Sequence, residues 1–324
     1  MKIALLFPGQ GAQYAGMGKD FFENEKSISV FEQAKEILGY DLKKVILEGT
    51  DEELRQTRIT QPAIFIVSVL CYNTFISKLP DSMKTTISHT AGHSLGEYSA
   101  LYASGVFDFS TGLKLVKKRA EFIQSVSEKN KGAMAAVIGL TQEQVQQVCK
   151  EVTAQGTLVE PVNYNSNEQT VISGTVAGVE KAVELAKQIA GTNKLFKTVV
   201  LNVSGAFHSS LMKEAADNMG KELSGTVLSD AKIPVISNYD GTGTVNAGEI
   251  KSKLEKQINH AVLWVQAINN LAGLGVNTVV ELGPGKVLSG LVKRINRNIS
   301  IYNIEDTITL NKTLEGLIKQ ESTL

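Results

Sequence analysis

A serine between two glycines points to nucleophilic chemistry. Residues 92–96 read Gly-His-Ser-Leu-Gly, a G-x-S-x-G pentapeptide centred on Ser94. Between a strand and a helix this spacing puts the serine on a sharp turn, and the small flanking residues leave room for a substrate near its hydroxyl. Residues 87–91 predict a short strand and residues 97–103 the start of a helix. The alternative is a glycine-rich turn whose serine only caps the helix, and the pentapeptide alone leaves both open.

A serine nucleophile needs a base to take its proton, and the chain has four histidines. His89 and His93 are too close to Ser94 in sequence to be the obvious base, and the surroundings of His260 favour a structural or exposed position. His208 lies where a predicted strand ends and a helix begins. Because ligands gather at the carboxyl ends of strands in an α/β sheet, we expect His208 and Ser94 at equivalent ends of two strands. A packing role at a helix N-terminus is the alternative.

Arg119 lies on an unexpected side of its predicted helix. Over residues 109–123 the apolar residues form one stripe and three lysines lie on the polar face, but Arg119 falls between the stripe and a second apolar pair. A buried guanidinium is costly without an anionic partner. The side chain therefore forms a buried salt bridge, reaches out to solvent, or binds a substrate carboxylate through two parallel hydrogen bonds.

Two more glycine-flanked turns follow predicted strands. Residues 8–11 read Pro-Gly-Gln-Gly, and exposed backbone N–H groups in such a turn can serve an oxyanion hole. The sequence lacks the spacing of a phosphate-binding loop. Residues 283–286 read Gly-Pro-Gly-Lys, and Lys286 would lie near the mouth of a site that faces an anion, which is a weak signal by itself.

The predicted elements describe an α/β fold with an insertion. Residues 130–198 follow a β-α-β-β-α-β order, the split βαβ or ferredoxin-like arrangement. We therefore predict a catalytic domain of residues 1–129 plus 199–324 with a largely parallel sheet, and an inserted subdomain at 130–198. The tail after about residue 312 is polar and is expected to fray. A strand at 195–201 is the last of the inserted unit, and the overlapping run 197–203 is expected to be buried. Further strands are predicted at 2–7, 87–91, 233–237 and 277–282, and helices at 28–38, 61–79, 97–103, 109–127 and 287–295.

Composition excludes some classes of function. The 33 basic and 33 acidic residues balance, so the chain has no general attraction to nucleic acid or to an anionic membrane. Cys71 and Cys149 have no metal or redox spacing, which suits a reducing cytosol. The first apolar run is too short for a signal peptide, and residues 62–72 are about half a membrane helix, so a buried helix is predicted there. We expect a cytoplasmic protein.

Taken together, six blocks resemble the malonyl-CoA:acyl-carrier-protein transacylase family, the free-standing malonyl acyltransferases of fatty-acid or polyketide synthesis. The blocks are in colinear order and span residue 3 to about 305. The resemblance implies an α/β-hydrolase-like large domain with an inserted ferredoxin-like small domain. The matching blocks are residues 6–18, 92–101, Arg119, 202–212, 257–264 and 281–291.

The same resemblance implies a role for individual residues. Ser94 would be the nucleophile and His208 its base, and Arg119 would bind the free carboxylate of the malonyl group. Gln257 would orient His208 through its backbone carbonyl, so that no third acidic residue is needed. This departs from α/β-hydrolase esterases, in which an aspartate or glutamate belongs to the triad.

The family further implies that the backbone N–H groups of Gln10 and Leu95 hold the oxyanion. The partners would be malonyl-CoA and the phosphopantetheine thiol of holo acyl carrier protein. Thioester and oxyester chemistry needs neither a metal nor a redox cofactor, so none is expected. One departure is His260-Ala261, where the family usually has a proline, and it puts only the local turn geometry in doubt.

Two alternatives remain at this stage. One is an acyl-thioester hydrolase of the same fold, and Arg119 argues against it because neutral acyl chains gain nothing from a buried cation. The other is a non-catalytic subunit that binds carrier protein. Carrier proteins are acidic, so a basic rim is expected, although each of its candidates also reads as ordinary solvated charge. The candidates are Lys286, Lys293, Arg294 and Arg297.

Overall fold

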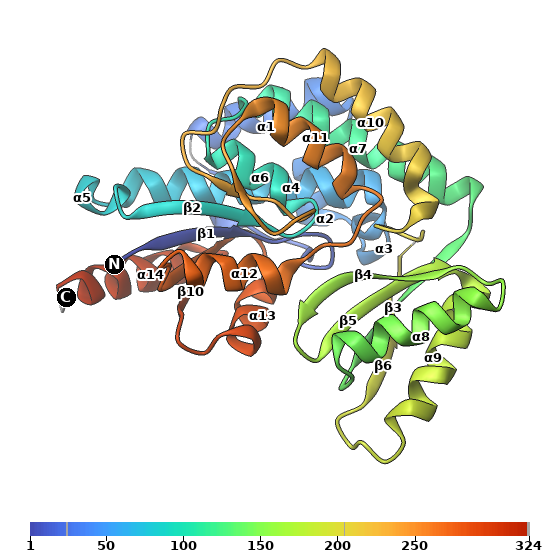
Figure 1. The fold of residues 1–324 in the computed structure, drawn as a ribbon. Coiled ribbons are helices and arrows are strands. Elements are labelled where there is room, and N and C mark those ends of the chain that lie inside the picture. The colour runs from blue at the N-terminus through green and yellow to red at the C-terminus, as the bar shows by residue number, and fades with distance from the viewer. Residues whose placement is uncertain (24, 204, 323–324) are drawn as a thin grey trace.

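The computed structural model describes residues 1–23, 25–203 and 205–322, which form two sheets with their helices (Figure 1). The larger sheet has the order β10-β9-β1-β2-β7-β8, and its neighbouring strands are parallel except for β7 and β8. The predicted α/β class with a mostly parallel sheet is confirmed. Its strands are β1 (Ile3–Phe7), β2 (Ile87–Gly92), β7 (Val235–Ile236), β8 (Gly243–Thr244), β9 (Thr278–Leu282) and β10 (Ser300–Ile304).

Alternating residues of β1 supply two separate cores, because successive strand side chains point to opposite faces. Leu5 and Phe7 pack with helices α4, α6 and α7, whereas Ala4 and Leu6 pack with α12 and α13. The helices of this part are α1 (Glu25–Leu38), α2 (Leu42–Glu48), α3 (Asp51–Arg55), α4 (Thr57–Lys78), α5 (Asp81–Lys84), α6 (Gly96–Ala103), α7 (Phe109–Lys129), α10 (Lys213–Gly225), α11 (Ala247–Gln257), α12 (Trp264–Gly273), α13 (Val287–Ile295) and α14 (Thr307–Glu321), with short 3₁₀ turns at Lys19–Phe21 and Ser210–Met212.

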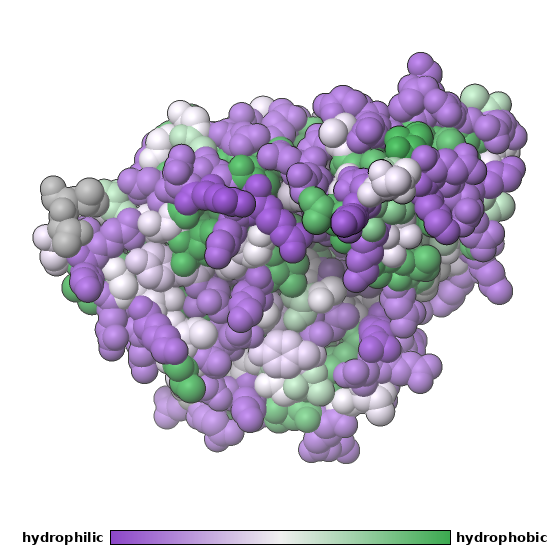
Figure 2. Space-filling view, turned by 90° about the horizontal axis from the view of Figure 1, so that it is seen from below, coloured by the Kyte–Doolittle hydropathy of each residue, from purple (hydrophilic) through white to green (hydrophobic). Residues whose placement is uncertain are grey.

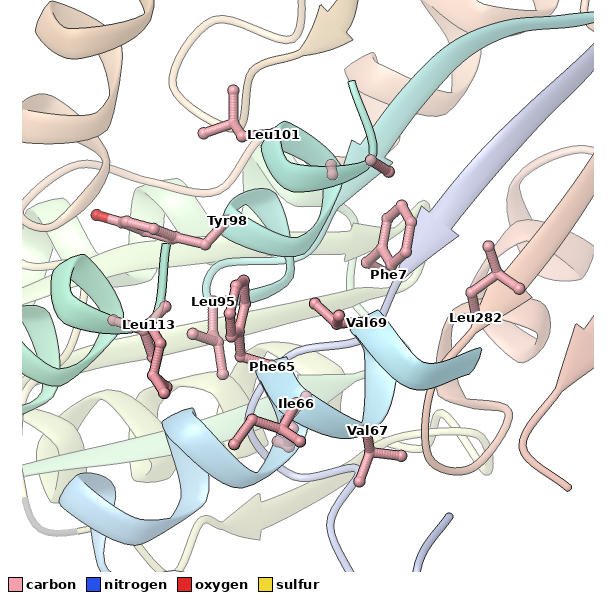
Figure 3. Packing of buried hydrophobic residues seen from close by; sticks show 14 of the residues in the cluster. Phe7, Phe65, Ile66, Val67, Val69, Leu95, Tyr98, Leu101, Leu113 and Leu282 are labelled. Carbon is pink, nitrogen blue, oxygen red and sulfur yellow. The ribbon is translucent and has the colours of Figure 1, made fainter. Parts of the chain in front are cut away.

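Helix α4 carries the apolar run at residues 62–72 through the middle of the protein. Its length and composition would allow it to cross a membrane, but 72% of its most apolar window is buried inside the protein. Phe65 of α4 lies beside Leu95 at the start of α6 (Figure 3). The prediction of a buried helix is confirmed. On the outside of the molecule, the face in Figure 2 is mostly hydrophilic, with hydrophobic side chains in separate patches.

The smaller sheet is antiparallel, in the order β4-β5-β3-β6. Helices α8 and α9 cover one face of it, and the other face turns toward the larger sheet (Figure 1). This is the predicted β-α-β-β-α-β arrangement, and the domain boundaries at 129/130 and 198/199 stay a prediction. Its elements are β3 (Gly132–Ile138), α8 (Gln142–Ala154), β4 (Val159–Ser166), β5 (Gln169–Thr175), α9 (Val176–Ala190) and β6 (Lys197–Val200).

Two predictions about elements were wrong. The run 197–203 was expected to be a buried strand, but β6 is the edge strand that ends the inserted β-α-β-β-α-β unit, and its Val200 is 70% exposed. The tail after residue 312 continues helix α14, because Leu310 and Leu317 lie two turns apart on one face and are fully buried. The polar residues of the tail form the other face of that helix.

The end of β10 and the start of α14 hold the segment that follows β1. The Tyr14 hydroxyl donates to Glu305 Oε2 at 3.0 Å, and the same oxygen accepts the Gly285 N–H at 3.0 Å. Further along, Asp20 Oδ2 accepts the backbone N–H and the hydroxyl of Thr307 at 3.1 and 2.9 Å. The first loop of the chain is therefore fixed by its last strand and helix.

Candidate active site

Ser94 lies on a sharp turn between β2 and α6. Its φ is +52°, and both glycines of the pentapeptide are required by close approach of backbone. A β-carbon on Gly92 would lie 2.0 Å from the Gly96 carbonyl oxygen, and one on Gly96 would lie 2.0 Å from the oxygen of Phe7. The strand–turn–helix setting expected for a nucleophile elbow is thus present.

His208 reaches Ser94 from outside the larger sheet. Its Nε2 lies 2.8 Å from Ser94 Oγ, and its Nδ1 lies 2.8 Å from the backbone oxygen of Gln257. The expectation that His208 follows a strand of the same sheet as Ser94 was wrong, because β6 belongs to the smaller sheet and ends at Val200. Ser204, at the predicted end of that strand, lies outside the described residues.

Ser94 and His208 are also the two non-glycine residues with positive φ in the described ranges, at +52° and +61°. Such conformations cost on the order of 1–3 kcal/mol each and cluster at functional sites. The folded protein therefore keeps two unfavourable backbone conformations, and both lie at the serine–histidine pair.

Arg119 of α7 is 1% exposed and points at the serine. Its Nη2 donates to Ser94 Oγ and to Gln257 Oε1, both at 3.0 Å, and its Nη1 donates to Gln61 Oε1 at 2.8 Å. No carboxylate of the described residues lies within salt-bridge distance of Arg119, which excludes a buried salt bridge. Its burial excludes a side chain that reaches solvent. The positive charge is held by neutral amides, and its Nε–H has no partner among these residues.

Burial and charge keep the histidine neutral. Desolvation, followed by the positive charge of Arg119, lowers the pKa of His208 to about 3, although the Gln257 carbonyl opposes this. At neutral pH the Gln257 carbonyl therefore accepts a hydrogen bond from Nδ1–H, and the unprotonated Nε2 accepts one from the Ser94 hydroxyl. This geometry is what general-base activation of a serine requires, and the roles of Ser94 and His208 stay a prediction.

The turns after β1 and β2 meet at one edge of the sheet, because these parallel strands are neighbours. A β-carbon on Gly9 would lie 2.3 Å from the His93 oxygen, which shows how closely the turns approach. The backbone N–H groups of Gln10 and Leu95 make no hydrogen bond to the described part of the chain. The Leu95 side chain is fully buried, whereas Gln10 lines the pocket. Both N–H groups are thus available for the predicted oxyanion hole, and that role stays a prediction.

One pocket joins these residues to the smaller sheet. Ser94, Arg119 and His208 line it from the larger domain. Met134 of β3 and Asn163 of β4 line it from the smaller one, and the Asn163 Oδ1 is buried with no partner among the described residues. Leu201, Val203 and Phe207 add apolar side chains to the lining. The pocket combines a serine hydroxyl, a buried cation and an apolar surface.

Several site residues were missed in the sequence. Gln61, which accepts a hydrogen bond from Arg119, directly precedes the apolar run at residues 62–72. A polar residue at the start of a buried helix indicates a buried hydrogen bond, and this could have been read from the sequence. Asn238 carried no signal at all: its Oδ1 accepts the Ser94 N–H at 2.5 Å and its Nδ2 donates to the Gly92 oxygen at 2.6 Å. Asn238, which follows β7, comes close to Ser94 because β7 pairs with β2.

The remaining candidates lie apart from the serine. His260 bonds the Lys256 backbone oxygen at an exposed position, and Arg294 donates to Gln169 of the smaller sheet at 2.9 Å. The described residues contain no group of three or more His, Cys, Asp or Glu side chains placed to hold a metal ion. These contacts do not test whether basic side chains form a rim for carrier protein, so the basic rim stays a prediction.

Residues 4–314 match the acyl transferase domain family, and the chain belongs to it. It is 42% identical over 322 residues to the malonyl CoA-acyl carrier protein transacylase of Bacillus subtilis, covering 99% of this chain and 98% of that protein. It is 41% identical to a polyketide biosynthesis malonyl CoA-acyl carrier protein transacylase of the same organism, covering 91% and 98% of the two chains. A solved malonyl-transacylase in complex with a type II polyketide acyl-carrier protein has a TM-score of 0.90 at 38% identity, covering 98% of this chain and all of that one. The resemblance predicted from the sequence blocks is confirmed, and the chain is an acyltransferase.

Proposed function

We propose that this protein transfers a malonyl group from malonyl-CoA to the phosphopantetheine thiol of an acyl carrier protein. The observation that carries the proposal is the Arg119 guanidinium, which is buried 3.0 Å from the Ser94 hydroxyl without an anionic partner in the described residues. A malonyl group brings a carboxylate close to its reacting thioester carbon. Binding it would supply the anion that a buried guanidinium requires.

In the first half-reaction, Ser94 Oγ attacks the thioester carbonyl while His208 Nε2 accepts its proton. The charge that develops on the carbonyl oxygen is stabilised by the N–H groups of Gln10 and Leu95. The carbon–sulfur bond then breaks, and the CoA sulfur takes the proton from His208. The malonyl ester of Ser94 remains, with its carboxylate held by Arg119.

The second half-reaction reverses these steps with another thiol. The pantetheine thiol gives its proton to His208, and its sulfur attacks the ester carbonyl. The carbon–oxygen bond breaks, and the Ser94 oxygen recovers a proton from His208. Because His208 is neutral at the start of each half-reaction, it can act as the base in both. We further propose a cytoplasmic location, because both cysteines are free, buried thiols.

The test measures intact mass after incubation with malonyl-CoA, acetyl-CoA or methylmalonyl-CoA, followed by addition of holo carrier protein. We expect a malonyl adduct that is absent from Ser94→Ala and that moves to the carrier. If no adduct forms and acylated carrier loses its acyl group to water, the protein is a hydrolase and the proposal is wrong.

A further inference from the structure

Glu97 is a buried acid beside the nucleophile that the proposed reaction does not use. It lies in the first turn of α6, is 3% exposed, and forms no salt bridge with the described cations. Its Oε2 accepts the backbone N–H of Asn238 at 3.1 Å and the side-chain Nε2–H of Gln257 at 2.7 Å. Burial raises its pKa to about 7, which the hydrogen bonds from Gln257 and Asn238 oppose. A buried carboxylate is expensive, so its placement needs a reason.

The Gln257 amide joins Glu97 to Arg119. Its Oε1 accepts from Arg119 Nη2 at 3.0 Å, and its Nε2 donates to Glu97 and, at 2.9 Å, to the backbone oxygen of Ser94. A guanidinium can only donate, whereas Glu97 Oε2 accepts from two N–H groups, either as part of a carboxylate or as the carbonyl oxygen of the neutral acid. Arg119 on one side, and Glu97 with the Ser94 backbone oxygen on the other, therefore allow one orientation of the amide between them. A reversed amide would set its NH₂ group against the guanidinium and its oxygen against the carboxylate.

Gln61 fixes the other end of the guanidinium in the same way. Its Oε1 accepts from Arg119 Nη1 at 2.8 Å, so each terminal nitrogen of Arg119 has one amide oxygen as an anchor. Glu97 and the Ser94 backbone oxygen together hold the Nε2 end of the Gln257 amide, so loss of the Glu97 contact would leave that end held by the Ser94 oxygen alone and would orient the guanidinium less firmly. A bidentate grip on a carboxylate depends strongly on the orientation of the planar group.

We propose that Glu97 is a positioning residue for acyl selection, because it holds the Gln257 amide in the orientation that aims Arg119 at a substrate carboxylate. The inference rests on the proposed function, since it takes Arg119 as the ligand of the malonyl carboxylate. It assigns Glu97 an effect on malonyl-CoA that acetyl-CoA, which lacks the carboxylate, does not share.

The test compares substitutions of two buried glutamates. Glu97→Asp keeps the charge but draws the carboxylate back from Gln257, whereas Glu97→Gln can place its Oε1 where Oε2 now accepts both N–H groups. Glu281→Asp is the matched control, because Glu281 is fully buried and accepts the N–H groups of Leu288 and Ser289, away from the pocket residues. The readout is kcat/KM for acylation of Ser94 by malonyl-CoA and by acetyl-CoA.

We expect Glu97→Asp to lower the malonyl-to-acetyl ratio at least tenfold, mostly through malonyl-CoA, which corresponds to about 1.4 kcal/mol. Glu97→Gln should restore the ratio to within about threefold of the unsubstituted protein, by the same conversion less than about 0.7 kcal/mol. Glu281→Asp should lower the melting temperature without changing the ratio.

Two outcomes overturn the inference. If Glu97→Asp slows both substrates equally, as a general loss of stability would, Glu97 only supports the fold. If Glu97→Gln loses as much selectivity as Glu97→Asp, an acceptor placed against Gln257 is not sufficient, and orientation of the amide does not explain the selection. Failure of the proposed function is distinct from both, because the unsubstituted protein would then form no malonyl adduct or would not prefer malonyl-CoA.

Discussion

Replacing Arg119 by methionine tests the central contact of the site. Methionine fills much of the same volume, so the main change is the loss of the guanidinium that bonds Ser94, Gln61 and Gln257. Two charge-assisted hydrogen bonds to a carboxylate contribute about 1.5–3 kcal/mol each, so the lower bound for the pair is about 3 kcal/mol. At about 1.4 kcal/mol per factor of ten, this predicts a loss of roughly 150-fold in kcat/KM for malonyl-CoA relative to acetyl-CoA.

The assay follows acylation of Ser94 by intact mass at several concentrations of each thioester. Lys118→Met is the control, because Lys118 directly precedes Arg119 in α7. Its side chain is 43% exposed, and its Nζ lies 3.3 Å from Glu121 Oε2. The control should keep both rates. Equal losses for malonyl-CoA and acetyl-CoA in Arg119→Met would refute the reasoning, since Arg119 would then act on the Ser94 hydroxyl and not on the substrate carboxylate.

Three further predictions follow from the geometry. His208 must be neutral to act, and burial with the Arg119 charge holds its pKa near 3, so kcat/KM for acylation by acetyl-CoA, which lacks the carboxylate that Glu97 would affect, should stay level from pH 7 to pH 5; a tenfold fall over this range, as for an ordinary histidine, would contradict the lowered pKa. Gly96→Ala puts a β-carbon 2.0 Å from the Phe7 oxygen, so thermal melting should reveal a loss of about 1–3 kcal/mol or more, and an unchanged melting temperature would refute the clash. Asn238→Leu leaves the half-buried Ser94 N–H without its partner, which costs up to about 1–3 kcal/mol, and acylation should slow while the malonyl-to-acetyl ratio is kept; a changed ratio would count against this role.

The sequence was most informative where one residue type determines the local backbone. The glycines at 92 and 96 identified the turn, and the helical period placed Arg119 on a buried face, both of which the structure bears out. Arg119 was the stronger signal, because a cation on an apolar face has few stable environments. The sequence could not choose between a salt bridge and a ligand, because that choice depends on the neutral amides of Gln61 and Gln257.

The errors arose where an element's partner lies far away in the chain. Residues 197–200 form the strand that the order of elements assigned to the insertion, but its position at the exposed edge of that sheet is set by pairing with β3 alone, which no local pattern reports. The final helix was missed because its polar residues outnumber its apolar ones, although Leu310 and Leu317 anchor it. Glu97 and Asn238 could not be assigned to the site because their meaning depends on the contact between them and on Gln257.

The contacts between the first loop and the end of the chain bear on synthesis at the ribosome. β1 leaves the ribosome early, yet its neighbour β9 and the Glu305 carboxylate that ties Tyr14 to Gly285 are made near the end. Domains generally fold as units, N-terminal parts first, and long-range strand pairing is slow. The turn bearing Gln10 cannot take its final shape on a growing chain. The loop that follows β1 therefore lacks these contacts until residue 305 has been made.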